Sequence, residues 1–178
     1  MKLKYLAVAC AAALTGTQAY ALTPADGAPA ANQEIYASGA SAQRKIFVGF
    51  VLDNLCDGTS NNTYAEVGDD ADSKDWAVVY CKAASGLAGI TAGSPLMVHK
   101  RNENGSFFGV GPVARQFNIQ FLDIFAKDAN GVNLCTLDGG TADPDDYLCD
   151  VSGLAAGGNK AFKQHIPDMG VSDVDPGI

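Results

Sequence analysis

Apolar and polar residues recur with different periods along the chain, and each period predicts a local structure. From Ala40 to Leu55, apolar residues return every three or four positions opposite a polar face, which predicts an amphipathic helix. Residues Trp76–Cys81 form a dense run rich in Val and Tyr, which favours a buried strand. Apolar and polar residues alternate over Phe117–Asp123, which predicts a half-buried strand.

The other predicted elements are shorter. They are strands at 34–38, 95–101 and 169–174, and a short helix at 159–165 that Pro167 would stop. Residues 57–74 and the cysteine-bounded acidic stretch 134–150 are expected to be polar loops. Strands that alternate with a few helices favour the α/β class.

The first 21 residues have the features of a secretory signal peptide. Lys2 and Lys4 flank the start of an apolar run that ends at Leu14, and Ala19-Tyr20-Ala21 matches the small-residue cleavage pattern. The run is about half of the ~20 residues that a membrane-spanning helix needs. We therefore expect a signal peptide (1–21), a flexible leader (22–33) and a single folded unit (34–178). The protein is expected to be periplasmic or secreted by a bacterium and not embedded in a membrane.

The net charge of the chain limits the classes of molecule that it is expected to bind. The chain has 12 basic and 20 acidic residues, a net charge of −8, and losing Lys2 and Lys4 with the signal peptide makes this −10. Such acidity argues against nucleic acid as a partner, because nucleic acid requires clustered positive charge. A small anion is not excluded, since local dipoles and one or two cations suffice to hold it.

Four of the five cysteines lie beyond the signal peptide. An even number in an exported chain predicts two disulfides. Four cysteines allow three pairings, and we favour Cys56–Cys81 with Cys135–Cys149 because each closes a local loop rich in Asp, Gly and Asn. No C-x-x-C pair supports zinc, and the acidic runs 69–72 and 143–146 lack the spaced ligands of a calcium loop. No metal or cofactor is expected.

Two short segments carry candidate chemistry. Ser38–Ser41 joins the first strand to the first helix, a geometry that leaves backbone N–H groups free to hold an anion. Gly170–Asp173 places a hydroxyl beside a carboxylate where a strand ends. The alternative is structural: Ser is a favoured helix N-cap, and Ser172–Asp173 is then an ordinary polar strand end. No G-x-S-x-G elbow orients a nucleophile, so an enzyme is not expected.

These two segments together resemble the N-terminal lobe of periplasmic phosphate-binding proteins of ABC transporters, within the type 2 periplasmic binding protein class. The resemblance implies an α/β lobe with a mixed sheet, incomplete because the second lobe is absent, that binds a small phosphate-like anion. It implies backbone amides and a hydroxyl from the first segment, and a hydroxyl and a carboxylate from the second. A weaker match to the family's Ser-Gly turn lies at residues 84–86. The implied ligand-binding residues are Ser38, Gly39, Ala40, Ser41, Ser85, Ser172 and Asp173.

The sequence departs from that family between Thr91 and Asp168, where further strands and cysteines intervene, and it is closer to a divergent secreted bacterial subgroup. The basic segment His99–Arg101 would attract an anion, although basic residues at a strand end are usually solvated. A second interpretation is therefore a non-catalytic secreted interaction domain that kept the lobe fold and lost solute binding. Its partner would be a membrane transporter or another secreted protein. A third is a fragment of a longer product.

Overall fold

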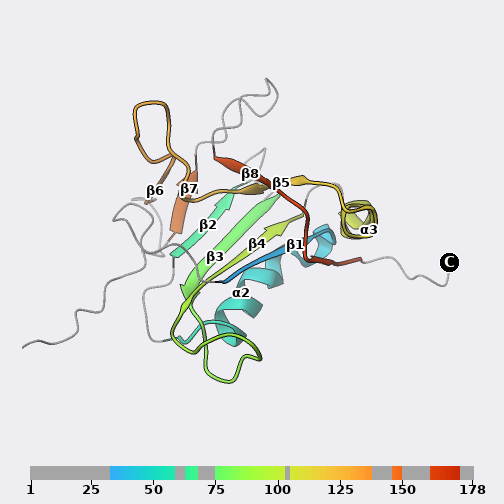
Figure 1. Cartoon of the computed structure of the whole chain (residues 1–178), viewed down its shortest axis with the longest axis horizontal. Helices are drawn as coiled ribbons and strands as arrows, with labels where there is room; N and C mark the ends of the chain where they lie inside the picture. Colours follow the sequence, from blue (N-terminus) through green and yellow to red (C-terminus); the bar gives the residue numbers. More distant parts are fainter. Residues whose placement is uncertain are drawn as a thin grey trace, which may run out of the picture.

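A mixed β-sheet forms the centre of the molecule, in a computed structural model that describes residues 33–58, 63–67, 75–102, 105–137, 146–149 and 161–172 (Figure 1). Four strands lie at the middle of this sheet, in the order β2 (Thr63–Val67), β3 (Trp76–Lys82), β4 (Pro95–Arg101) and β1 (Gln33–Ser38). Short strands extend both sides: β7 (Asp146–Cys149) and β6 (Cys135–Leu137) beyond β2, and β9 (Met169–Gly170) beyond β1. The α/β class predicted from the sequence is confirmed.

The two faces of the sheet carry different layers (Figure 1). Helix α2 (Arg44–Asn54), preceded by the 3₁₀ turn η2 (Ser41–Gln43), covers one face, which we call the α2 face. The antiparallel pair of β5 (Ile119–Leu122) and β8 (Phe162–His165) lies over the other, the β5–β8 face. Helix α3 (Gly105–Arg115) packs at the ends of β1 and β9.

Strand β3 shows how the sequence builds both layers. Alternate side chains of a strand point to opposite faces. Trp76, Val78 and Tyr80 belong to the core under β5 and β8, whereas Val79 and Cys81 belong to the core under α2. A strand buried on both faces needs a continuous apolar run, and this run is what the sequence displays.

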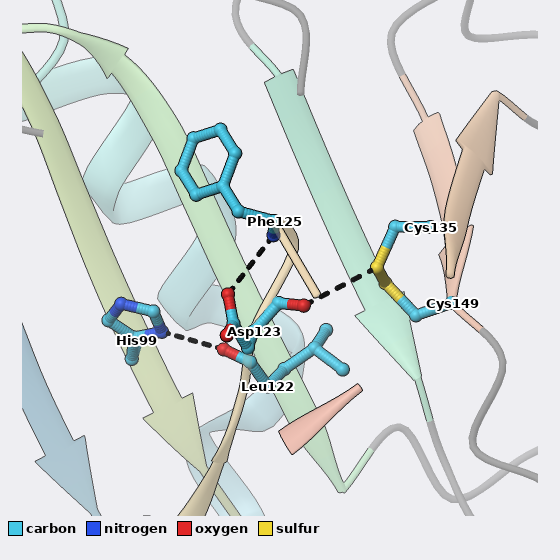
Figure 2. The surroundings of a disulfide bond; sticks show 6 residues. All are labelled: His99, Leu122, Asp123, Phe125, Cys135 and Cys149. Atoms are coloured by element: carbon cyan, nitrogen blue, oxygen red, sulfur yellow. Dashed lines mark hydrogen bonds between the residues drawn. A yellow bond between two sulfur atoms is a disulfide. The ribbon is translucent and has the colours of Figure 1, made fainter. Parts of the chain in front are cut away.

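The predicted disulfides Cys56–Cys81 and Cys135–Cys149 are confirmed. The first lies in the core of the α2 face. The second joins opposed residues of β6 and β7 and lies in the core of the β5–β8 face. Figure 2 shows the chain after β5 between this disulfide and β4, with Asp123 O 3.8 Å from Cys135 Sγ. Each layer therefore has its own covalent link.

Three predictions of local structure are wrong. The segment expected as a helix at 159–165 contains strand β8 at Phe162–His165, because pairing with β5 decides its conformation. Strand β2 lies within the expected loop 57–74, and β6 and β7 lie within the expected loop 134–150. The β5–β8 and β2–β7 pairings join segments that are distant in sequence, whereas β2 also pairs with β3 and β6 pairs with β7, in each case the next strand along the chain.

Helix α3 was not predicted, because its three glycines (Gly105, Gly109 and Gly111) and Pro112 disfavour an isolated helix. Strand β1 begins one residue before the predicted strand, at Gln33. The predicted signal peptide and the rest of the predicted leader lie outside the described residues. No helix in the described part of the chain is long and apolar enough to cross a membrane.

Candidate functional site

The ends of three neighbouring strands meet at one edge of the sheet. Strand β1 runs parallel to β4 on one side and to β9 on the other, so their carboxyl ends point the same way. Gly39 N donates to Arg101 O at 2.9 Å, and Val171 N donates to Ser38 O at 2.8 Å. We call this region the carboxyl edge. It joins the two segments that carry the resemblance described above.

The turn after β1 has an unusual backbone. Gly39 has φ +88° and Ala40 has φ +54°, and both are buried. The left-handed region is costly for Ala, and such residues gather at functional sites. The N-cap of α2 is Gln43, which makes no side-chain capping bond, and Ser38 Oγ instead donates to Phe108 O at 2.7 Å. Ser38 therefore does not cap α2, and the side chain of Ser41 lies outside what the structure describes.

Three glycines allow α3 to touch the carboxyl edge. A Cβ on Gly39 would lie 2.3 Å from Gly109 Cα. A Cβ on Gly109 would lie 2.0 Å from Val171 O, and one on Gly170 would lie 1.5 Å from Gly109 O. Atoms cannot pack this closely, so these positions admit glycine only. The helix that sequence propensity disfavours is thus fixed by contact with β1 and β9.

A buried cation lies beneath the turn. Lys100 is 1% exposed and points to the α2 face. Its Nζ donates to Gly39 O and, at 3.3 Å, to Arg101 O, and lies 6.0 Å from the centre of the Phe47 ring. Both acceptors are neutral carbonyls. Burial lowers the pKa of Lys100 to about 8, so the ammonium is charged at neutral pH at a cost in desolvation.

The sequence-predicted site residues divide into three groups. The structure brings Ser38, Gly39, Ala40 and Ser172 to the carboxyl edge, where the backbone of Ser41 begins η2. Ser85 is exposed near the C-terminal end of α2, where Ala84 N donates to Leu55 O, at the opposite end of the sheet. The structure therefore does not bring Ser85 to the other predicted ligands. Asp173 lies outside the described residues.

A groove of about 670 Å³ opens beside the carboxyl edge. Six of its described lining residues belong to helix α3, and the seventh is Ser172. Most of the lining is apolar, with Phe107 and Val110 among the residues that contribute. One of the predicted ligand-binding residues, Ser172, therefore also lines the groove.

A second polar cluster occupies the β5–β8 face. His99 is fully buried, with Nδ1 3.1 Å from Leu122 O (Figure 2) and its ring stacked on Tyr36 at 4.5 Å. The other side of the Tyr36 ring stacks on His165 at 3.8 Å. Tyr36 Oη donates to Glu34, and Lys163 Nζ lies 2.5 Å from Glu34 Oε2. The cluster links β1, β4 and β8.

Electrostatics in this cluster favour a neutral His99 beside an ionised Glu34. Contacts with His99, Lys163 and Tyr36 hold the pKa of Glu34 well below its usual value. Burial lowers the pKa of His99, and its Nε2 is 3.4 Å from Glu34 Oε2, longer than a good hydrogen bond. Burial, followed by the Glu34 carboxylate, raises the pKa of Tyr36. The buried Nε2 of His99 has no hydrogen-bond partner in the described part of the chain. The other contacts join side chains of β1, β4 and β8, which supports a structural role for the cluster.

Sequence reasoning expected the basic segment of β4 to be solvated, and the structure buries it. Arg101 lies over the Phe108 ring at 4.7 Å, on the face opposite Lys100. The alternation of β4 would have assigned these side chains to opposite faces. It could not have shown that both faces are covered at the end of the strand.

Comparison with known protein families, curated proteins and solved structures finds no match to this chain. Among the described residues, no group of three or more His, Cys, Asp or Glu side chains is placed to hold a metal ion. The acidic segments 69–72 and 143–145, and the side chain of Asp146, lie outside what the structure describes. The two disulfides fit an extracellular or otherwise oxidising compartment.

Proposed function

We propose that this chain is an exported, periplasmic-binding-protein-like lobe that recognises a small oxyanion, with inorganic phosphate as the first candidate. The anion would lie at the carboxyl edge, against the start of η2 and beside Ser172. The function is binding without catalysis. A membrane transporter or another secreted protein would be its macromolecular partner.

The observation that carries the proposal is the position of Lys100 beneath the Gly39–Ala40 turn. A buried ammonium costs free energy unless a negative charge compensates it. Its hydrogen-bond partners here are neutral carbonyls, one of them in the turn itself. An oxyanion bound above the turn would receive backbone N–H groups from the helix start and would partly compensate this charge.

The arrangement of strands supports the same location. In α/β sheets, ligands bind outside the carboxyl ends of parallel strands. Strands β4, β1 and β9 supply three adjacent ends here. The left-handed backbone of Gly39 and Ala40 turns the chain from the end of β1 into η2 at this edge.

Calorimetric titration of the mature chain with phosphate and with sulfate tests the proposal. Ser172→Ala should weaken phosphate binding about fivefold, as expected for one lost hydrogen bond. Ser85→Ala is the matched control, because Ser85 lies at the opposite end of the sheet, and it should leave binding unchanged. Absence of heat and of any thermal shift at millimolar phosphate and sulfate would refute the proposal.

An interaction domain without solute binding is the second candidate. Large apolar side chains are exposed on both helices, with Ile46 67% exposed on α2 and Phe107 64% exposed on α3. Cross-linking to a secreted partner, together with a blank anion titration, would select this function. Heat from phosphate that Ser172→Ala reduces would reject it.

A further inference from the structure

The groove beside α3 is amphipathic along its length. Ser106 lies where α3 begins and Arg115 lies where it ends, and Ser172 follows Val171, whose carbonyl meets Gly109 in the first half of α3. Phe107, Val110 and Ala114 supply apolar surface between them. The groove therefore has hydroxyl groups toward the start of α3, a cation at its end and an apolar wall along the helix.

The lining follows from helix geometry. Residues 106, 110 and 114 are four apart, as are 107 and 111, so they share one face of α3. From Ser106 to Arg115 the helix rises about 13 Å at 1.5 Å per residue. A ligand with a charged group at Ser172 and an apolar group along α3 would lie on this face.

Charge distinguishes the groove from the rest of the molecule. The chain has a net charge of −8, whereas the described lining of the groove contains one cation, Arg115, and no carboxylate. Its volume of about 670 Å³ is in the range of small-molecule sites and is larger than a phosphate ion requires. The volume therefore fits an organic ligand larger than phosphate, and the described lining places no carboxylate against its anionic group.

We infer that the groove holds the apolar ester group of an organic phosphate, whose phosphate group lies at the Ser172 end. This inference rests on the proposed function, because Ser172 belongs both to the carboxyl edge and to the groove. Phe107 and Val110 are 64% and 56% exposed, so an aryl group seated on them removes their apolar surface from water. Burial on this scale should improve affinity about tenfold over an ester of similar charge without the aryl group.

Titration of the mature chain with inorganic phosphate, methyl phosphate and phenyl phosphate tests the inference. Phenyl phosphate should bind about tenfold more tightly than methyl phosphate. Phe107→Ser should reduce that ratio to about one and leave the affinity for methyl phosphate unchanged. Val132→Ser is the matched control, because Val132 is an exposed apolar residue (61%) outside the groove, and it should preserve the ratio.

The outcomes separate the inference from the proposed function. Equal affinity for methyl and phenyl phosphate, or a phenyl preference that Phe107→Ser does not change, overturns the inference while phosphate binding stands. Failure of all three compounds to bind overturns both. Self-association that Phe107→Ser abolishes, with no phenyl preference, would instead make the groove an interface between copies and overturn the inference.

Discussion

The two faces of strand β4 bury neighbouring basic residues in opposite ways. His99, on the β5–β8 face, stacks on Tyr36, meets Leu122 O and lies beside an ionised Glu34. Among the described residues, the hydrogen-bond acceptors of Lys100, on the α2 face, are two neutral carbonyls. A network whose polar groups pair with one another stabilises a fold. A buried charge that is held only by neutral dipoles lowers stability, and binding of an anion nearby would compensate it. Burial of a basic residue therefore does not by itself show whether the protein compensates its charge.

Each face also has its own disulfide, and removing either should have the largest effect. Cys56→Ala with Cys81→Ala should lower the free energy of unfolding by about 3.5 kcal/mol, and Cys135→Ala with Cys149→Ala by about 3 kcal/mol. The first pair costs more because it spans 25 residues and the second spans 14. Urea denaturation of the two double variants measures both values. A larger loss for the shorter loop would show that strand pairing, and not chain entropy, sets the difference.

Truncating the His99 side chain should destabilise the packing of the β5–β8 face. His99→Ala should lower the free energy of unfolding by about 2 kcal/mol, because a cavity replaces the stacked ring and Leu122 O loses its partner. His99→Phe keeps a ring against Tyr36 and should cost about half as much. Phosphate affinity should not change in either variant. Reduced phosphate affinity in His99→Phe would show that the β5–β8 face also contributes to phosphate binding, and would contradict the contrast between the two faces.

The Lys100→Met variant should have the opposite effect on stability. Removing the buried charge should raise the free energy of unfolding by about 1 kcal/mol at pH 7, after the loss of the Gly39 contact. The same variant should weaken phosphate binding. Denaturation and titration of one preparation measure both. Lower stability with unchanged affinity would assign Lys100 a structural role.

The pH dependence of stability provides a second test of the buried charge on Lys100. The folded pKa of Lys100 is about 8, below its unfolded value of 10.5, so the unfolded state binds more protons between these values. Stability should therefore rise with pH above 8, by about 2 kcal/mol before tyrosine ionisation opposes it near pH 10. Lys100→Met should lack this rise, which thermal melts from pH 7.5 to 9.5 would detect. A rise that persists in the variant would come from another group.

The smallest effect is expected at acid pH on the other face. The folded pKa of Glu34 is below its usual value of 4.5, so its contribution is present above that pH and is lost as pH falls below it. Glu34 is partly exposed, so solvent screening limits the contribution to less than about 1 kcal/mol. Glu34→Gln should flatten the stability profile between pH 5 and pH 3. An unchanged profile would show that the ion pair of Glu34 with Lys163 does not contribute to stability.

Local sequence determined the elements whose signal is contained in a few neighbouring residues. The apolar run of β3 identified a strand buried on both faces, and the apolar period after Ala40 identified α2. The cysteine pairing also followed from local loops. Composition and hydrophobic period act over short distances, so a single sequence reveals them.

Tertiary structure alone decided the elements and sites that depend on distant partners. Helix α3 forms although its glycines disfavour it, because it packs against the segment after β9. Only glycine at position 109 allows the close contact with Val171. Strand β8 exists because β5 pairs with it, and Lys100 is buried because α2 and the turn at Gly39 cover it. Local propensity amounts to less than about 1 kcal/mol per residue, so the packing of distant segments overrides it. For the same reason the sequence suggested an anion site at Ser38–Ser41, and only the fold placed a buried cation beneath it.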